Sequence, residues 1–302
     1  MHFAAPPRLL LPNCLVALLL AVAAPAAVRA QEAKPDRFYE LETKYLFGFT
    51  DGTDIGAEGE KEIELETTAA FQKRGGRYNS TEQEFEWEQV PSQYWGYELS
   101  AHAMSQQMFG VQGLDNRAQT TFSGLSWTPK WLVVGRGPGN PFGLSLSVQP
   151  EWDRIDGTSG AHSANFSFTT KLAVDTELMP NMLYAAVNLI YAPEYDRAIG
   201  DSGWSRASSY GATAALAYRV APKVTMGGEV EYYRAYDGFG LNAFSGAALY
   251  AGPTLHIQFN PKVFLSAAWS MEIAGHASGD PGRLDLTNFE RQHANLKMGF
   301  EF

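Results

Sequence analysis

Cysteine is almost absent from this sequence. The single one, Cys14, lies in an apolar stretch near the N-terminus. Loss of that stretch during export would leave a chain without thiols, which excludes disulfides and zinc–cysteine sites. The histidines are not spaced as metal ligands either. We therefore expect neither a cofactor nor a metal.

Long apolar runs and basic clusters are also missing. After residue 30 no apolar run approaches the roughly 18 residues that mark a helical membrane span. The formal net charge is −10, and no basic run interrupts the acidic background. Nucleic acid is therefore not an expected partner.

The first thirty residues, in contrast, have the order of an export signal. Arg8 provides a weakly basic start, residues 15–24 are apolar, and small residues precede Ala30. This order predicts a signal peptide at residues 1–30, cleaved after Ala30. A retained membrane anchor is the alternative, but prolines interrupt a stretch that is too short to span a bilayer.

Short polar breaks that contain proline recur along the rest of the chain. Proline lacks the N–H that a strand ladder needs, so these breaks predict turns. They centre on Pro91, Pro129, Pro180, Pro222 and Pro261. Longer gaps rich in Gly, Asp and Ser lie between them, at residues 110–116, 156–161, 194–205 and 237–245. We expect the glycine-rich residues 134–141 to lengthen one turn.

The segments between these breaks alternate apolar and polar residues. Phe142, Leu144 and Trp152 share one face of such a segment, opposite Ser145 and Glu151. These alternations last about ten residues, which at ~3.3 Å each and a tilt of ~40° rise roughly 25 Å. That is the height of the apolar band of an outer-membrane barrel, whereas strands of soluble proteins most often have about five or six residues.

The pattern predicts an all-β fold, a transmembrane antiparallel up-and-down β-barrel of about 12 strands (range 10–14) with both termini in the periplasm. The expected strands are 58–72, 79–90, 93–108, 117–128, 142–155, 162–177, 181–194, 207–220, 223–236, 246–259, 262–275 and 289–302. Residues 37–50 are a candidate for one additional strand. Residues 31–56 are expected to form a periplasmic N-terminal segment that could enter the lumen as a plug, and residues 57–302 the barrel.

The last residues of the chain alternate and end on an aromatic side chain. Leu296, Met298, Phe300 and Phe302 share one face. This pattern resembles the terminal strand by which Gram-negative outer-membrane β-barrel proteins are recognised by the barrel-assembly machinery. The resemblance implies insertion into the outer membrane after export. Residues 56–66 also resemble the entry to the first strand in uncharacterised barrels of the phenol-degradation-pathway type.

The first two predicted strands carry an unusually acidic polar face. If their apolar side faces lipid, the carboxylates line the lumen, where rings of carboxylates favour cations. The alternative is a polar filling in which they pair with Arg, Lys, Tyr and water. The predicted lumenal, cation-binding residues are Glu62, Glu64, Glu66, Glu82, Glu84, Glu86, Glu88 and Glu98. Lys171, Arg219 and Lys297 are the expected inward cations.

A catalytic alternative rests on Glu98, Ser100 and His102, which share one face as acid, nucleophile and base might. The Ser-x-His order is the reverse of the His-x-Ser order of barrel lipases, and the predicted phase turns these side chains away from lipid. We therefore expect no enzyme, with a lipid hydrolase as the alternative.

These patterns together predict a narrow channel or binding barrel for small solutes, with an acidic lumen, in the outer membrane. A barrel enzyme acting on lipid or lipopolysaccharide, and a closed structural barrel, remain open. The expected partners are outer-membrane lipid and lipopolysaccharide, the barrel-assembly machinery and a small-molecule solute.

Deletion of Phe302 tests the terminal-strand motif. We expect the shortened chain to assemble poorly, because the aromatic residue completes the apolar face of the last predicted strand. The measurement is the fraction of chain in the outer membrane that migrates as a folded barrel on unheated gels. Normal insertion of this variant would contradict the motif.

Overall fold

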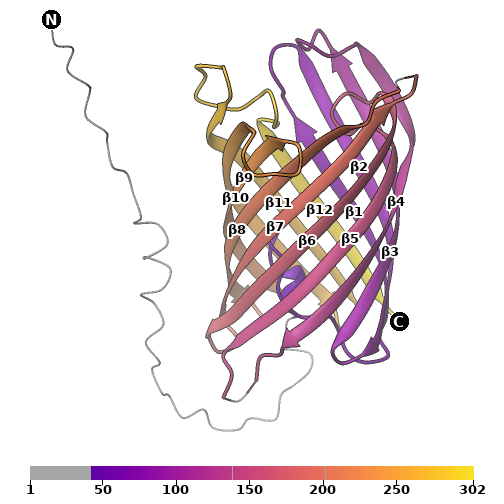
Figure 1. Ribbon diagram of the computed structural model, residues 1–302. Helices are drawn as coiled ribbons and strands as arrows, with labels where there is room; N and C mark the ends of the chain where they lie inside the picture. Colours follow the sequence, from indigo (N-terminus) through magenta and orange to yellow (C-terminus); the bar gives the residue numbers. More distant parts are fainter. Residues whose placement is uncertain (1–41, 138, 201) are drawn as a thin grey trace, which may run out of the picture. The chain divides into compact units, whose positions relative to one another are not determined.

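A closed antiparallel barrel makes up almost all of the computed structural model (Figure 1), which describes residues 42–137, 139–200 and 202–302. The expected signal peptide lies outside the described residues, as do residues 31–41. The described strands are β1 (Lys61–Phe71), β2 (Arg77–Ser92), β3 (Trp95–Phe109), β4 (Arg117–Val134), β5 (Phe142–Ile155), β6 (His162–Met179), β7 (Leu183–Ala198), β8 (Ser205–Ala221), β9 (Val224–Asp237), β10 (Phe244–Asn260), β11 (Val263–Ala277) and β12 (Gln292–Glu301). The predicted all-β barrel of about twelve antiparallel strands is confirmed.

The barrel closes where β12 pairs with β1. Phe300 lies opposite Ile63 and Met298 opposite Leu65, in continuous antiparallel register. Closure leaves neither strand with a free edge. A free edge would be unfavourable in a bilayer, because lipid cannot hydrogen-bond the backbone N–H and C=O groups. The terminal strand therefore occupies the closing position that the sequence predicts.

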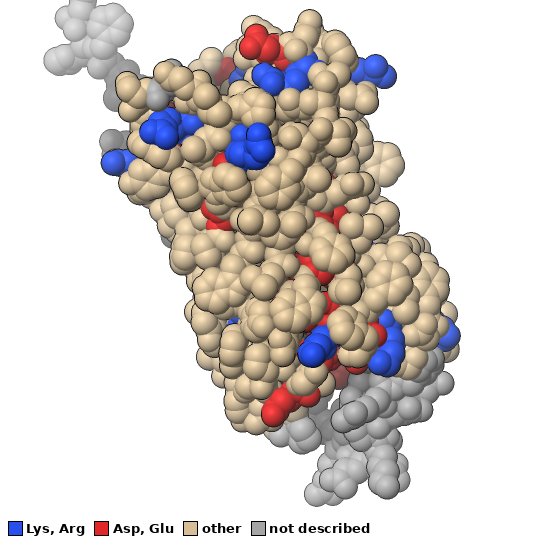
Figure 2. Space-filling model, turned by 90° about the vertical axis from the view of Figure 1, so that its right-hand side faces the viewer, with Lys and Arg blue, Asp and Glu red and all other residues tan. Residues whose placement is uncertain are grey.

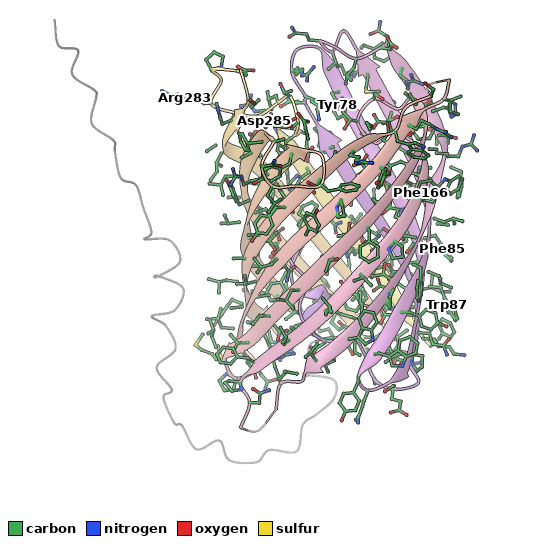
Figure 3. The ribbon with its side chains drawn as sticks, in the orientation of Figure 1. Tyr78, Phe85, Trp87, Phe166, Arg283 and Asp285 are labelled. Carbon is green, nitrogen blue, oxygen red and sulfur yellow. The ribbon has the colours of Figure 1, made fainter. Side chains whose placement is uncertain are left out.

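Side chains alternate between the two faces of the wall along most of each strand. On β11, Trp269 and Ile273 point outward and are 55% and 57% exposed, whereas Ser270 and Glu272 are buried inside. Phe85 and Phe166 likewise project from the outer surface (Figure 3). The middle of the face in Figure 2 is mostly free of Lys and Arg, which lie toward its two ends. The outer surface is thus suited to lipid.

Helices contribute little to this architecture. Among the described residues, none forms a helix with the length and apolar character needed to cross a membrane. A short 3-10 helix, η1 (Thr43–Tyr45), lies in the segment for which an additional strand was a candidate. The described part of that segment, residues 42–50, forms no strand.

One predicted turn is wrong. Pro129 lies inside β4, which continues to Val134, and the connection to β5 comes only after that residue. The β4–β5 ladder is interrupted between the Ser126–Glu151 and Lys130–Ser147 pairs, and both Pro129 and Pro150 lie in that gap. A proline is tolerated within a strand where the ladder is already broken, since its missing N–H then costs no bond.

Residues 42–56 lie against the inner face of the barrel wall. Leu46 and Phe47 are buried in a cluster with Tyr184, Ala186, Ala215 and Ala217, which are inward residues of β7 and β8. Gly48 comes so close to the wall that a Cβ atom there would lie 2.2 Å from the Ala268 Cβ and from the Glu229 Oε1. The segment therefore fills part of the lumen.

A charge placed on the outer face of a central strand tests the membrane-facing surface. Val230 is 46% exposed in the middle of β9, and Val230→Arg should lower the free energy of unfolding by about 2–4 kcal/mol in lipid bilayers. Denaturant titration in vesicles measures this. Ile199→Arg, in the loop after β7, is the control and should change stability by less than about 0.5 kcal/mol. Equal effects would argue against a lipid-facing β9.

Candidate functional site

The predicted glutamates form one continuous acidic wall on the inner faces of β1, β2 and β3. Glu62 lies opposite Glu88, Glu64 opposite Glu86, and Glu66 opposite Glu84. Glu88 in turn lies opposite Glu98 on β3. Like charges that face each other directly across a ladder destabilise it, so this wall needs cations close by.

Three lysines supply positive charge to the wall. The Lys44 Nζ lies 2.8 Å from a Glu88 carboxylate oxygen and 3.4 Å from one of Glu62. The Lys297 Nζ lies 2.9 Å from a Glu66 oxygen and 3.7 Å from one of Glu64, and Lys130 pairs with Glu98. The three lysines therefore form ion pairs with five of the eight predicted residues.

Sequence reasoning identified Lys297 as an inward cation but missed Lys44 and Lys130. Lys130 was assigned to a turn because it follows Pro129, although it points inward from β4. Lys44 belongs to the N-terminal segment. This segment is not a strand, so the direction of its side chains cannot be predicted from a period of two.

The same N-terminal segment is tied to the opposite side of the barrel through its backbone. The N–H groups of Phe49 and Thr50 donate to the Glu229 carboxylate at 2.9 and 3.1 Å. Asn188 accepts from the Asp51 N–H at 2.7 Å and donates to the Asp51 carbonyl at 2.8 Å. The Thr53 N–H donates to Asp175 at 2.9 Å. Buried backbone groups thus find their partners in wall side chains.

Asp51 of this segment lines a lumenal cavity of about 230 Å³. Its carboxylate pairs with Lys171. Burial raises the pKa of Asp51, but Lys171, Lys297 and Lys130 outweigh it and lower the pKa from 3.8 to about 2. The carboxylate is therefore ionised throughout the physiological range.

The structure does not join Glu98, Ser100 and His102 into a relay. The His102 Nδ1 lies 2.9 Å from a Glu82 carboxylate oxygen, and its Nε2 lies 3.0 Å from the Ser126 hydroxyl. Glu98 is bound by Lys130 instead. Ser126 was missed because it belongs to β4, which is far from His102 in sequence and beside it in the sheet.

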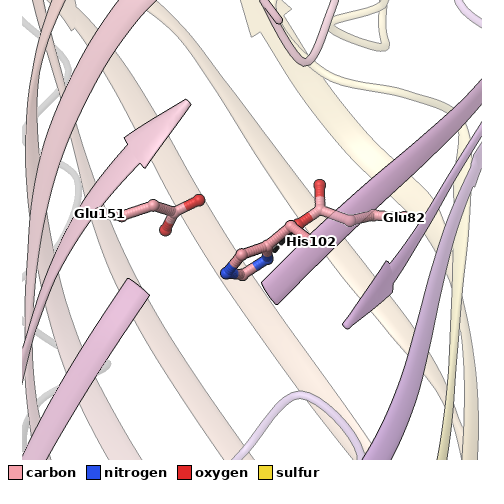
Figure 4. Close-up of side chains that lie close together, drawn as sticks. All are labelled: Glu82, His102 and Glu151. Atoms are coloured by element: carbon pink, nitrogen blue, oxygen red, sulfur yellow. Dashed lines mark hydrogen bonds and ion pairs between the residues drawn. The ribbon is translucent and has the colours of Figure 1, made fainter. Parts of the chain in front are cut away.

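Among the residues that the structure describes, two groups of side chains in the lumen have ligand atoms close enough to hold a metal ion. Glu86, Glu88 and Glu98 form the first, within the lysine-braced wall. Glu82, His102 and Glu151 form the second (Figure 4). The glutamates of β2 and β3 in these groups were predicted as lumenal, cation-binding residues, but their grouping as metal ligands was not, since spacing along one strand does not reveal ligands that come from several.

The low pKa of Asp51 gives a pH-dependent prediction. A carboxyl group with a lowered folded-state pKa stabilises the fold above its unfolded value of 3.8, and this contribution is lost as pH falls through about 2. Asp51→Asn should therefore lower the free energy of unfolding at pH 7 and leave it nearly unchanged near pH 2. Denaturant titrations of both proteins across this range measure the difference. A loss that is the same at both pH values, or an equal loss in the loop variant Asp115→Asn, would contradict it.

Solved structures share this barrel fold. The chain is similar to the COG4313 outer membrane channel from Pseudomonas putida F1, with 14% identity, a TM-score of 0.54, and coverage of 83% of this chain and 98% of that chain. It is also similar to the beta domain of the Bordetella autotransporter BrkA, with 12% identity, a TM-score of 0.52, and coverage of 81% and 100%. At these identities the likeness is one of fold, that of a closed antiparallel β-barrel.

The sequence matches fewer known proteins than the fold does. Comparison with curated proteins gave no match. Residues 40–302 match the model of a protein family described as "Family of unknown function (DUF6662)". The chain belongs to this family, DUF6662.

Proposed function

We propose that this chain is an outer-membrane barrel that passes or binds small solutes through an acidic lumen narrowed by residues 42–56. The observation that carries the proposal is the N-terminal segment held inside a closed barrel beside a charged cavity. The Pseudomonas putida protein of similar fold is an outer membrane channel, which agrees with this proposal. Residues 1–30 would be the export signal, and both termini would lie in the periplasm.

The size of the free space supports a small solute. Barrels of about eight strands are filled by side chains, and those of sixteen to eighteen leave an open channel. A barrel of intermediate size that also holds residues 42–56 retains a cavity of about 230 Å³. Pockets for drug-sized ligands occupy roughly 300–1,000 Å³, so the solute would be smaller than these.

The charge of the cavity supports a preference for cations. Four lysines and seven carboxylates line it, a formal balance of 4 − 7 = −3. The carboxylates are Asp51, Asp54, Glu64, Glu66, Glu84, Glu86 and Glu98. Carboxylates that line a pore attract cations. The same groups also brace the wall through their lysines, so the acidic wall serves both purposes in this proposal.

Two alternatives have less support. An enzyme acting on lipid would need its nucleophile to reach the bilayer, whereas Ser100 and His102 are both buried within the barrel. A closed structural barrel would have no use for the charged cavity beside Asp51. In the proposal, lipopolysaccharide contacts the outer surface, and the assembly machinery recognises the terminal strand.

Removal of the N-terminal segment tests the narrowing. Single-channel recordings in planar bilayers should show small steps for the full chain and larger ones after deletion of residues 42–56. Gly48→Val should act in the same direction, because a side chain there would collide with Ala268 and Glu229. Gly203→Val, at a position with open space around it and no left-handed backbone conformation, is the steric control. No conductance from any of these folded proteins would overturn the channel proposal.

Neutralisation of the wall tests selectivity. Replacement of Glu64, Glu66, Glu84 and Glu86 by Gln should lower the cation-to-anion permeability ratio, since the cavity would lose four negative charges. Reversal potentials in a salt gradient measure this. The matched control replaces four exposed carboxylates, Glu58, Asp115, Asp237 and Asp280, by their amides. An unchanged ratio in the wall variant would make the acidic wall purely structural.

A further inference from the structure

Glu82, His102 and Glu151 meet in the lumen from strands β2, β3 and β5. In Figure 4 the two carboxylates point toward the imidazole from opposite sides. None of the three lines the cavity beside Asp51. We propose that these residues form a binding site for one divalent transition-metal ion, and this site does not depend on whether the barrel conducts.

The distances suit a metal ion after small side-chain movements. One ligand atom from each residue lies within 4.8 Å of the other two. Metal–nitrogen and metal–oxygen bonds of ~2.0–2.2 Å hold ligand atoms roughly 3–4 Å apart. The imidazole is 2% exposed, and a hydrogen bond of 3.0 Å with the Ser126 hydroxyl orients it. Ligating histidines are commonly held in this way by a second polar group.

A β-bulge in β4 shapes the wall next to His102. Gly124 is paired with His102 and Phe122 with Ala103, so Ser123 is an extra residue, and both Ser123 and Gly124 are buried. A Cβ on Gly124 would lie 1.9 Å from the Asp153 Oδ1. The missing side chain therefore leaves the space that the Asp153 carboxylate occupies.

The bulge also leaves an unused oxygen in this part of the wall. The Ser123 side chain is 1% exposed, and its hydroxyl has no hydrogen-bond partner among the described residues. Bulges often adjust side chains beside functional sites. Asp153 lies beside Gly124, the partner of His102 in the sheet, and Ser123 precedes Gly124 in the chain, so both bring oxygen atoms to this part of the wall.

The charge around the site distinguishes it from the acidic wall. Over the described part of the chain, no lysine or arginine forms an ion pair with Glu82, Glu151 or Asp153. In the all-carboxylate group, by contrast, Lys44 pairs with Glu88 and Lys130 with Glu98. The protein's own cations already serve that group, whereas the carboxylates around His102 have only its imidazole.

The ligand set selects the class of ion. Magnesium and calcium prefer sites made of oxygen atoms alone. Imidazole nitrogen together with carboxylates suits zinc, nickel, copper and iron. The combination of Glu82, His102 and Glu151 therefore favours Zn²⁺ or Ni²⁺ over Ca²⁺ and Mg²⁺.

Calorimetric titration of the full chain with Zn²⁺ tests the site. The protein is folded in detergent, stripped with a chelator, and shown to be a folded barrel by its mobility on unheated gels. We expect one Zn²⁺ per chain, with binding weakened at least tenfold in each of Glu82→Gln, His102→Ala and Glu151→Gln. Ca²⁺ at the same concentrations should give no saturable binding.

Matched variants separate the site from general carboxylate binding. Glu86→Gln, in the lysine-braced group on the same strand as Glu82, and His276→Ala, an exposed histidine, should leave Zn²⁺ affinity within about twofold of the parent. Ser126→Ala should retain one site, because the hydroxyl only orients the ring. Absence of Zn²⁺ binding by the folded parent would overturn the proposal. Zn²⁺ binding that survives His102→Ala, or that falls equally in Glu86→Gln, would also overturn it.

Discussion

The pairing of β1 with β12 is the constraint on which the rest of this structure depends. In a bilayer a free strand edge has no water to satisfy its N–H and C=O groups, and each unsatisfied group costs several kcal/mol. The ladder must therefore close. Once it is closed, each strand has an outer face toward lipid and an inner face toward the lumen. Successive side chains along a strand point to these two faces in turn. Every lumenal feature follows from that division.

Closure concentrates charge on one side of the lumen. β1 and β2 are neighbours, so their alternating glutamates face one another directly. Buried like charges destabilise a fold unless countercharges lie close by. Lys130 and Lys297 come from the wall, but Lys44 comes from the N-terminal segment. The segment and the acidic wall are therefore mutually dependent: each supplies the partner that the other needs.

The lumen thus has two regions, which differ in whether lysines form ion pairs with their carboxylates. Lysines neutralise much of the wall beside the segment, and Asp51 adds a carboxylate that faces Lys171. Around His102 the carboxylates of Glu82 and Glu151 have no such partner among the described residues. A lumen with one region where lysines pair with carboxylates and one region without such pairs can hold residues 42–56 in place and still offer a site to a diffusible cation.

Much of this could be predicted from the sequence because barrel strands repeat. The outward position of Trp269 and Ile273, the inward position of Glu64 and Glu86, and the closing position of the last strand all follow from a period of two. The exception is instructive. Pro129 was assigned to a turn because proline lacks an N–H, but a strand accepts it where its ladder is already interrupted, and sequence does not show where ladders break.

The sequence by itself determined the fold class, the approximate strand count and the face on which most strand residues lie, because these depend on local alternation. Only the tertiary structure decided which lumenal residues meet. His102 lies beside Ser126, Glu82 and Glu151 through strand register and barrel curvature. Lys44 reaches Glu88 because a segment without strand periodicity turns back into the barrel. Contacts across the lumen join residues that are distant in sequence, and no pattern along the chain encodes them.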